Sequence, residues 1–399
     1  MTATINAGGR LAADPAPQLA QRLAQVLPVV REQARAIDEQ AVFPKRSLAA
    51  LRASGLLGLL VPVEYGGLGG DLSDLAGLAA DLAGECLSTA MIWAMHCQQV
   101  CAIVAAGSPD LRRRLLPRIA RGEVYIASVT SEKGKGGHLL TAQAPLRHAD
   151  GMLEISREAP IVTGGNDADG FLITMRDNPD APASAVSLVY ADRGHLTISS
   201  SGSWNPMGMR GTHSVALRIS GRVDEDNLVG TPGEFRAVAV SVFAPAGHIA
   251  WAACWLGAAR AALHGFIELL RSPVGRHQFD VRSDLLRTRL ARIRLDLDTV
   301  AALLAQCLRD LRTADDLEAV PVQLRINALK VLAAERSFAV VDALTEIAGL
   351  RHAYLRDAPL GLERKFRDLR SASLNYANDR LLLANGALTL LDRGVSLAL

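Results

Sequence analysis

The sequence predicts a mainly α-helical protein with a central β-domain: an N-terminal helix bundle, then a β-sandwich or barrel, then a C-terminal four-helix bundle. Apolar residues recur at the spacing of helices toward both ends of the 399-residue chain. Between these zones, short apolar stretches alternate with Gly, Asp, Asn and Pro, as in strands joined by turns. The composition, 49% hydrophobic but only 4% aromatic and rich in Ala and Leu, agrees with a mostly helical protein.

A helical domain is expected over residues 15–121, after a disordered N-terminus formed by residues 1–14. Its first helix is indicated by apolar residues at helical spacing, namely Leu19, Leu23, Val26, Leu27 and Val30. Pro44 and the glycines of residues 66–70 interrupt the pattern, because Pro and Gly disfavour a continuing helix. The helical signal resumes in residues 72–106 and again near the end of the domain.

A β-domain is expected over residues 122–232, and a second helical domain over residues 233–399. Strand-like apolar stretches such as residues 172–175 and 186–190 are bounded by turn residues. The last domain carries an apolar repeat in alternating steps of four and three: Leu286, Leu290, Ile293, Leu297, Val300, Leu304, Cys307 and Leu311. Such a repeat of about 3.5 residues suits antiparallel helices that pack at shallow angles in a bundle.

The nearly neutral charge of the chain bears on whether it binds polyanions such as nucleic acid or anionic membranes. A formal charge of +2, from 43 basic and 41 acidic residues, gives no reason to expect binding to nucleic acid or to an anionic membrane. No apolar run reaches the ~18 residues of a membrane span, and residues 1–14 lack the features of a secretory signal. The five cysteines lie in apolar surroundings without metal-type pairing, so we expect free thiols, no metal site and a cytoplasmic location.

Four groups of motifs occur in order along nearly the whole chain. They are Phe43-Pro44 with residues 55–67; Gly122-Glu123 with Ser131–Gly137; Met207–Thr212 with Gly221–Gly230; and Arg276–Phe279 with Arg367–Arg370. Together they resemble the acyl-CoA dehydrogenase family. The resemblance implies an FAD site between the β-domain and the C-terminal bundle. It also implies a homo-oligomer built as a dimer of dimers, because FAD contacts in this family cross between subunits.

The resemblance assigns the flavin ring to residues of the β-domain. Ser131 stands where the family has a threonine that bonds the pyrimidine edge of the flavin, in a loop that includes Gly136. Thr163 matches the threonine that bonds near flavin N5. Ile161 stands where the family usually places a tryptophan against the ring. This exchange removes stacking area and opens room on one flavin face.

The resemblance assigns the rest of FAD to the last bundle. Arg276 matches the arginine that reaches the pyrophosphate of a neighbouring subunit, where its planar fork suits phosphate oxygens, and Phe279 is its apolar partner. Gly349 is the glycine that remains of a Gly-Gly step close to the adenosine diphosphate. Thr345 replaces a glutamine and Asn378 a threonine. Both can still form hydrogen bonds, so FAD binding is expected to be weakened but retained.

The chain departs from the family at the catalytic base. In the family, an Arg-Asp pair, Arg367-Asp368 in this chain, is followed eight residues after the Asp by a glutamate that takes the α-proton of an acyl thioester. That position holds Tyr376, and a phenol with an ordinary pKa near ~10 is a poor base at neutral pH. The other location of the base, ten residues before Gly257, holds Gly247.

Three residues are candidates to replace the base. Asp379 lies three residues after Tyr376, and His248 adjoins the second location with an ordinary pKa near ~6.5. Tyr376 itself would serve if a nearby cation lowered its pKa. Each has a structural interpretation as well. Asp379 would pair with an arginine such as Arg380 or Arg370, Tyr376 would line the pocket, and His248 would cap a helix or replace an arginine usual there.

Three functions remain open. The first is an FAD-dependent oxidoreductase that passes a hydride from an acyl thioester, carried by coenzyme A or a carrier protein, to flavin N5. The second is a flavin monooxygenase of the same fold, which uses reduced FAD or FMN from a reductase, hydroxylates through a C4a-hydroperoxyflavin and needs no α-proton base. The third is a catalytically degenerate subunit that pairs with an active paralogue.

Overall fold

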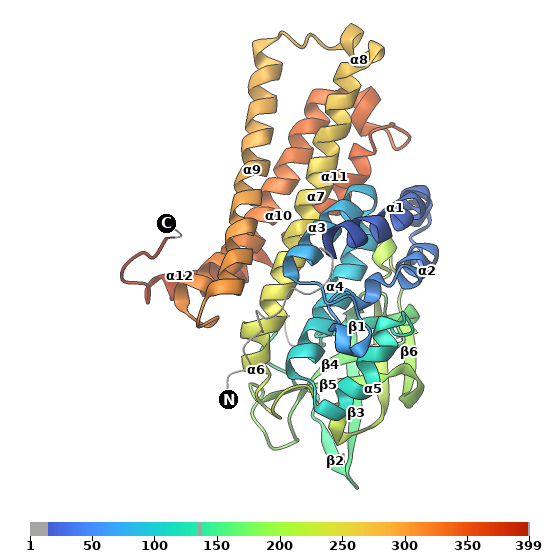
Figure 1. Ribbon diagram of the computed structural model, residues 1–399, viewed down its shortest axis with the longest axis vertical. Helices are drawn as coiled ribbons and strands as arrows, with labels where there is room; N and C mark the ends of the chain where they lie inside the picture. The colour runs from blue at the N-terminus through green and yellow to red at the C-terminus, as the bar shows by residue number, and fades with distance from the viewer. Residues whose placement is uncertain (1–14, 135–137, 398–399) are drawn as a thin grey trace.

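The computed structural model describes residues 15–134 and 138–397, and it confirms the predicted class of a central β-region between helical domains (Figure 1). The predicted disorder of residues 1–14 and the predicted site residue Gly136 lie outside the described residues.

Five helices form the N-terminal part: α1 (Pro15–Gln40), α2 (Lys45–Ala53), α3 (Leu72–Glu85), α4 (Leu87–Ala106) and α5 (Pro109–Ala120). Asp71 caps the N-terminus of helix α3: its carboxylate accepts hydrogen bonds from the backbone N–H groups of Ser73 and Asp74, as in a capping box. The loop before α3 folds back on itself, and a Cβ at Gly67 would lie 2.1 Å from the carbonyl oxygen of Val61. Only glycine fits such an approach, so the glycine-rich interruption seen in the sequence is a tight loop.

The β-domain consists of two sheets. In the three-stranded sheet, β4 (Gly170–Arg176) lies between β1 (Ile126–Val129), which is parallel to it, and β5 (Val186–Asp192), which is antiparallel. The four-stranded antiparallel sheet has the order β2-β3-β7-β6, with the bounds Arg147–Ala149 (β2), Met152–Val162 (β3), Val215–Asp224 (β7) and Leu196–Ser201 (β6). The register of β3 and β7 breaks between Ala159 and Val162. This irregularity presents Ile161 at the end of β3.

The C-terminal part is helical again. Its elements are α6 (Phe235–Val238), α7 (Ala244–Arg271), α8 (Pro273–Gln278), α9 (Asp284–Thr313), α10 (Val320–Gly349), α11 (Leu362–Arg370) and α12 (Asn378–Thr389). Three long helices, α7, α9 and α10, run side by side (Figure 1). The predicted 3.5-residue repeat lies on the inner face of α9, because Ile293, Leu297 and Val300 are buried there.

Helix α7 joins the two helical parts into one core. It packs against α3 and α4 on one side and against α9 and α10 on the other. A Cβ at Gly257 would lie 2.1 Å from the carbonyl oxygen of Ala80, so α3 and α7 approach backbone to backbone. Among the described residues, α4 and Phe235–Arg271 are long and apolar enough to cross a membrane. About 72% and 67% of their apolar windows are buried inside the protein, as in core helices.

Candidate functional site

The flavin residues expected in the β-domain meet at one edge of the four-stranded sheet. The hydroxyl of Ser131, which follows β1, donates a hydrogen bond to the carbonyl of Ile161 at 2.6 Å and accepts one from the Ile161 N–H at 3.3 Å. The Thr163 and Ser214 hydroxyls lie 3.0 Å apart. Ile161 is 55% exposed as a whole residue. The edge therefore presents an apolar surface beside hydroxyl groups, although the single proton of the Ser131 hydroxyl is already used by the backbone.

A buried ion pair holds this edge in place. Arg157 and Glu132 lie 2.8 Å apart with almost no exposed side-chain surface, and Arg157 also donates to the carbonyl of Ser131 at 3.0 Å. The Glu132 carboxylate accepts two further hydrogen bonds, from the N–H groups of Gln143 and Ala144 at 2.8 and 2.7 Å. Burial lowers the pKa of Arg157. Arg157 is a supporting residue that the sequence reasoning missed. Its signal was its position among Leu153, Ile155 and Ala159, the inward-facing alternate residues of β3.

Two of the three candidate bases lie close together. Tyr376 is in the turn between α11 and α12 with φ of 49°, and its ring centroid lies 6.4 Å from that of His248 on α7. Burial raises the pKa of Tyr376, an effect that Arg380 opposes only in part. Burial, together with the charge of Lys330, lowers the pKa of His248 to about 3. Asp379 is exposed in the first turn of α12.

Tyr376 and His248 extend into a row of aromatic side chains along α7. The ring of His248 lies 6.1 Å from that of Trp251, which lies 6.3 Å from that of Trp255. These three residues, at steps of three and four, share one face of the helix. We call His248, Trp251, Trp255 and Tyr376 the aromatic wall. Sequence reasoning found two adjacent members, Tyr376 and His248, but not the two tryptophans, which lie within the apolar pattern of the helix.

The second location of the base is closed by packing. A Cβ at Gly247 would lie 2.3 Å from Nε2 of Gln98, a buried side chain of α4. Gln98 is itself fixed, because Nε2 donates to the carbonyl of Phe243 at 2.7 Å. A carboxylate at this position would therefore require displacement of Gln98.

The residues expected to hold the adenosine diphosphate lie near α8, at the opposite end of the bundle from α12 (Figure 1). Arg276 donates from Nε to the carbonyl of Arg271 at 2.9 Å and stays exposed, and Phe279 packs edge-on against Phe266 at 5.5 Å. At the end of α10, Gly349 has φ of 67°. The Thr345 hydroxyl donates to Val341 within its own helix at 2.8 Å. Within one chain, the residues expected to hold the adenosine diphosphate therefore lie apart from Tyr376.

Asn378 lies neither at the flavin edge of the β-domain nor among the residues near α8. It is buried at the start of α12, where its Oδ1 accepts a hydrogen bond from the Lys330 ammonium at 2.8 Å. Its amide nitrogen donates to Oε1 of Glu335 at 3.2 Å. Both ends of this side chain are therefore engaged inside the bundle.

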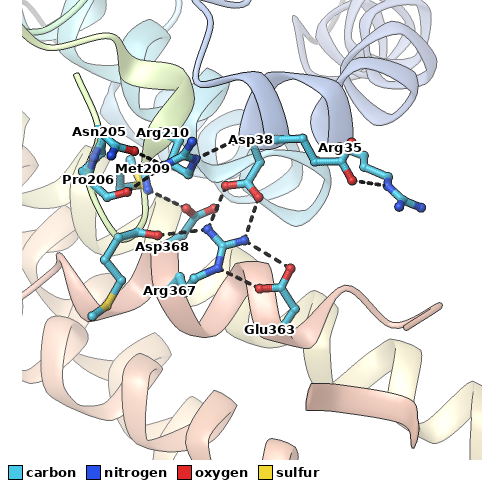
Figure 2. Close-up of polar contacts among 11 residues, drawn as sticks. Arg35, Asp38, Asn205, Pro206, Met209, Arg210, Glu363, Arg367 and Asp368 are labelled. Atoms are coloured by element: carbon cyan, nitrogen blue, oxygen red, sulfur yellow. Dashed lines mark hydrogen bonds and ion pairs between the residues drawn. The ribbon is translucent and has the colours of Figure 1, made fainter. Parts of the chain in front are cut away.

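The Arg-Asp pair that precedes Tyr376 joins three parts of the chain (Figure 2). The Arg367 guanidinium donates to both carboxylate oxygens of Asp38 on α1, at 3.0 and 2.6 Å, and to both of Glu363, at 2.7 and 3.1 Å. It also donates to the carbonyl of Met207 at 2.9 Å, in the loop before β7. Asp368 accepts from the N–H of Met209 at 2.6 Å, and burial raises its pKa to about 6. We call these contacts the Arg367 node; its role in this structure is architectural.

Comparison with known proteins agrees with this architecture. Family models for "Acyl-CoA dehydrogenase, N-terminal domain" and "Acyl-CoA dehydrogenase, C-terminal domain" match residues 21–123 and 249–379. The chain is 30% identical over 200 residues to cyclohex-1-ene-1-carbonyl-CoA dehydrogenase of Syntrophus aciditrophicus (strain SB), covering 50% of this chain and 48% of that one. The match thus spans only about half of that relative's length. It is 24% identical over 348 residues to dibenzothiophene monooxygenase of Rhodococcus qingshengii, covering 82% of each chain.

Solved structures of a dibenzothiophene monooxygenase and of a butyryl-CoA dehydrogenase share the fold. FMN-bound TdsC from Paenibacillus sp. A11-2 has a TM-score of 0.83 at 22% identity, covering 94% of this chain and 98% of that one. Butyryl-CoA dehydrogenase from Megasphaera elsdenii also has a TM-score of 0.83, at 17% identity, covering 96% and 100%. The two family models together cover more than half of the sequence, in the order of the helical domains that surround the β-domain. The chain belongs to the acyl-CoA dehydrogenase family.

Proposed function

We propose that this protein is a flavin-dependent monooxygenase that acts on a small planar aromatic substrate. The observation that carries the proposal is the state of the residues at the two locations of the family's base. Neither Tyr376 nor Gly247 supplies a carboxylate, and the raised pKa of Tyr376 makes its phenol a still poorer proton acceptor. Oxygen transfer to an aromatic ring needs no α-proton base.

The alternative bases support the same conclusion. A general base is most effective when its pKa lies near the working pH. His248 is neutral at pH 7, but a pKa of about 3 makes its imidazole a weak proton acceptor. Asp379 is exposed at the start of α12, whereas Tyr376 and His248 face each other. None of the three candidates is therefore an effective base for removal of an α-proton.

The residues at the edge of the β-domain fit a flavin ring. Ile161 offers an exposed apolar side chain, and the half-buried Thr163 carries a hydroxyl close by, which matches a flat ring that is part apolar and part polar. The buried pair of Arg157 and Glu132 keeps this edge rigid. A reduced flavin bound there would supply two electrons for the reaction of O2, one oxygen atom going to the substrate and the other to water.

The aromatic wall supports an aromatic substrate. Trp251 and Tyr376, its two half-buried members, offer flat ring faces on which a planar ring can stack or pack edge-on, whereas His248 and Trp255 are buried. Isoleucine in place of the usual tryptophan at residue 161 leaves additional room. Two relatives point the same way by name: dibenzothiophene monooxygenase matches over 82% of the chain, and TdsC has been solved with indole.

We also propose a homo-oligomer, arranged as a dimer of dimers. Helix α8, which contains Arg276 and is followed by Phe279, lies at the opposite end of the bundle from α12, which Tyr376 precedes, so one chain brings only part of an FAD site to each location. A second copy would supply the missing part. The free protein is accordingly expected to elute at a multiple of 42.4 kDa.

An acyl-thioester dehydrogenase is the second candidate, because the match to cyclohex-1-ene-1-carbonyl-CoA dehydrogenase has the higher identity, 30%. One preparation separates the functions. The protein is mixed with FMN or FAD, a flavin reductase, NADH and indole under ¹⁸O₂, and separately with oxidised flavin and butyryl-CoA or cyclohex-1-ene-1-carbonyl-CoA without oxygen. We expect ¹⁸O in the indole product and no bleaching by either thioester.

Bleaching of the flavin by a thioester without oxygen would overturn the proposal in favour of the dehydrogenase. Failure to bind flavin or to turn over either substrate, with activity only beside a co-expressed paralogue, would favour a degenerate subunit. The variant Tyr376→Phe serves as a check on the role of the phenol. It should retain oxygen transfer, whereas a dehydrogenase that used this phenol as its base would lose about 10²–10⁴-fold in rate.

A further inference from the structure

We infer that Lys330 is a positioning residue: its buried ammonium group holds residues 372–378 so that Tyr376 keeps its place beside His248 in the aromatic wall. Nothing in the sequence motifs singles out this lysine, which lies in the middle of α10. The inference goes beyond the proposed function, because it concerns the placement of Tyr376 whatever reaction the site performs.

The contacts of Lys330 account for its whole donor capacity. The side chain has no exposed surface. Its Nζ donates to the carbonyl of Ala372 at 3.2 Å, to the carbonyl of Tyr376 at 3.0 Å and to Oδ1 of Asn378 at 2.8 Å. An ammonium group has three protons, so each one has an acceptor. Two of the acceptors lie in the turn between α11 and α12, and the third, Asn378, is the first residue of α12.

This turn requires such a clamp. Tyr376 has φ of 49°, a left-handed conformation that is unfavourable for a residue with a Cβ and persists only when the surroundings impose it. The turn also has backbone hydrogen bonds of its own, among them those from the N–H of Asn375 to Ser371 and from the N–H of Asn378 to Ser373, both 3.0 Å, of which the second joins residues on either side of Tyr376. The bond from Lys330 to the Tyr376 carbonyl acts at the strained residue itself.

The surroundings of the ammonium link it to the aromatic wall. Nζ lies 5.5 Å from the ring centroid of Trp255, over its face, where a cation is attracted to the ring. Its charge is one of the causes that keep His248 neutral. Glu335 reaches the cluster through Asn378, at 3.2 Å, and partly offsets the effect of burial, which lowers the pKa of Lys330 to about 8. Lys330 therefore contacts the turn on one side and the aromatic wall on the other.

A second buried lysine provides a matched control. Lys365 on α11 is 9% exposed, donates to the carbonyl of Gly84 at 3.2 Å, and has a pKa that burial likewise lowers to about 8. Its acceptor lies at the end of α3, outside the turn. Substitution of Lys365 removes the same kind of group from the core and leaves the contacts between Lys330 and residues 372–378 intact.

The test compares Lys330→Met with Lys365→Met in the full chain by hydrogen–deuterium exchange and mass spectrometry. Exchange in peptides that cover residues 371–378 should accelerate at least tenfold in Lys330→Met and less than twofold in Lys365→Met, with β3 and β7 unchanged in both. The fluorescence of the wall tryptophans should shift only in Lys330→Met. In the indole assay, kcat/KM should fall at least tenfold in Lys330→Met and less than twofold in Lys365→Met.

Equal exchange in the two variants, or unchanged exchange in Lys330→Met, would overturn the inference. If Lys330→Met does not fold, Asn378→Ala replaces it, since this variant removes one of the three acceptors. We then expect a smaller but still local acceleration in residues 371–378, and no acceleration would overturn the inference. Exchange is measured without substrate, so a failed proposal about the reaction and a failed inference about Lys330 give different results.

Discussion

Replacement of Arg367 by methionine tests the Arg367 node. The variant Arg367→Met keeps the bulk of the side chain and removes its charge, which leaves Asp38 and Glu363 without their partner. We expect the free energy of unfolding to fall by about 3–5 kcal/mol, the range found when one member of a buried ion pair is removed. The side chains of Arg367 and Asp38 are only 15% and 10% exposed, so solvent replaces little of the lost interaction.

The magnitude follows from the contacts. Arg367 makes four hydrogen bonds to the two carboxylates and one to the Met207 carbonyl. Hydrogen bonds to charged groups contribute about 1.5–3 kcal/mol each. The loss is smaller than five such bonds because the cost of burying the arginine is also removed. Most of the remaining penalty is the burial of the Asp38 carboxylate, which is 7% exposed as a whole residue.

The assay is urea unfolding of the flavin-free protein, followed by far-UV circular dichroism. Arg294→Met is the control, because the pair of Arg294 with Asp298 is 70% and 56% exposed and should contribute only about 0.3–0.5 kcal/mol. The double variant Asp38→Asn with Arg367→Met should recover part of the loss, since it no longer buries an unpaired charge. A free energy of unfolding for Arg367→Met within about 1 kcal/mol of that of the unsubstituted protein would refute the buried-pair reasoning.

Two further substitutions test neighbouring sites. Asp368→Asn keeps an acceptor for the Met209 N–H and should stabilise the protein by up to about 3 kcal/mol above pH 6, because burial raises the carboxyl pKa to about 6 from 3.8. The folded protein holds the Asp368 proton more tightly than the unfolded chain does, so the stability of the unsubstituted protein falls as the pH rises from about 4 to 6. The urea midpoints of Asp368→Asn and of the unsubstituted protein should coincide near pH 3 and separate by pH 7. A difference between them that does not change with pH would contradict this reasoning. Gly247→Ala should cost about 1–3 kcal/mol, since its Cβ would lie 2.3 Å from Nε2 of Gln98. Gly265→Ala in the same helix meets nothing closer than 3.6 Å and should gain up to about 1 kcal/mol in thermal or urea unfolding; equal effects at the two glycines would contradict the packing at Gly247.

The fold was predictable where one physical pattern dominates a long stretch. The repeat that includes Ile293 and Val300 identified the inner face of α9, because burial of one side repeats over many turns. Alternation and turn residues likewise identified the β-region. Such patterns average over many residues, so a few exceptions do not change the result.

The supporting residues of the site were not predictable in this way. Arg157 and Lys330 are single charged residues within ordinary strand and helix patterns. Their importance comes from partners far along the chain: Lys330 binds residues 42 to 48 positions away. Motif resemblance located Tyr376 and His248, but burial shifts the pKa of both and Lys330 adds to the shift of His248, which only the three-dimensional structure reveals.

The Arg367 node and the clamp around Lys330 are separate pieces of the molecule, although the residues they fix lie within a dozen positions of one another. The node joins the domains, and residue 376 sits beyond it on a turn with its own anchor. An enzyme lineage can therefore exchange the group at residue 376 without disturbing the joint that assembles the protein. For the same reason, an Arg-Asp pair at these positions indicates how the domains are joined and does not indicate which reaction the protein catalyses. Residue 376 can be substituted in engineering experiments while the contacts of Arg367 stay in place.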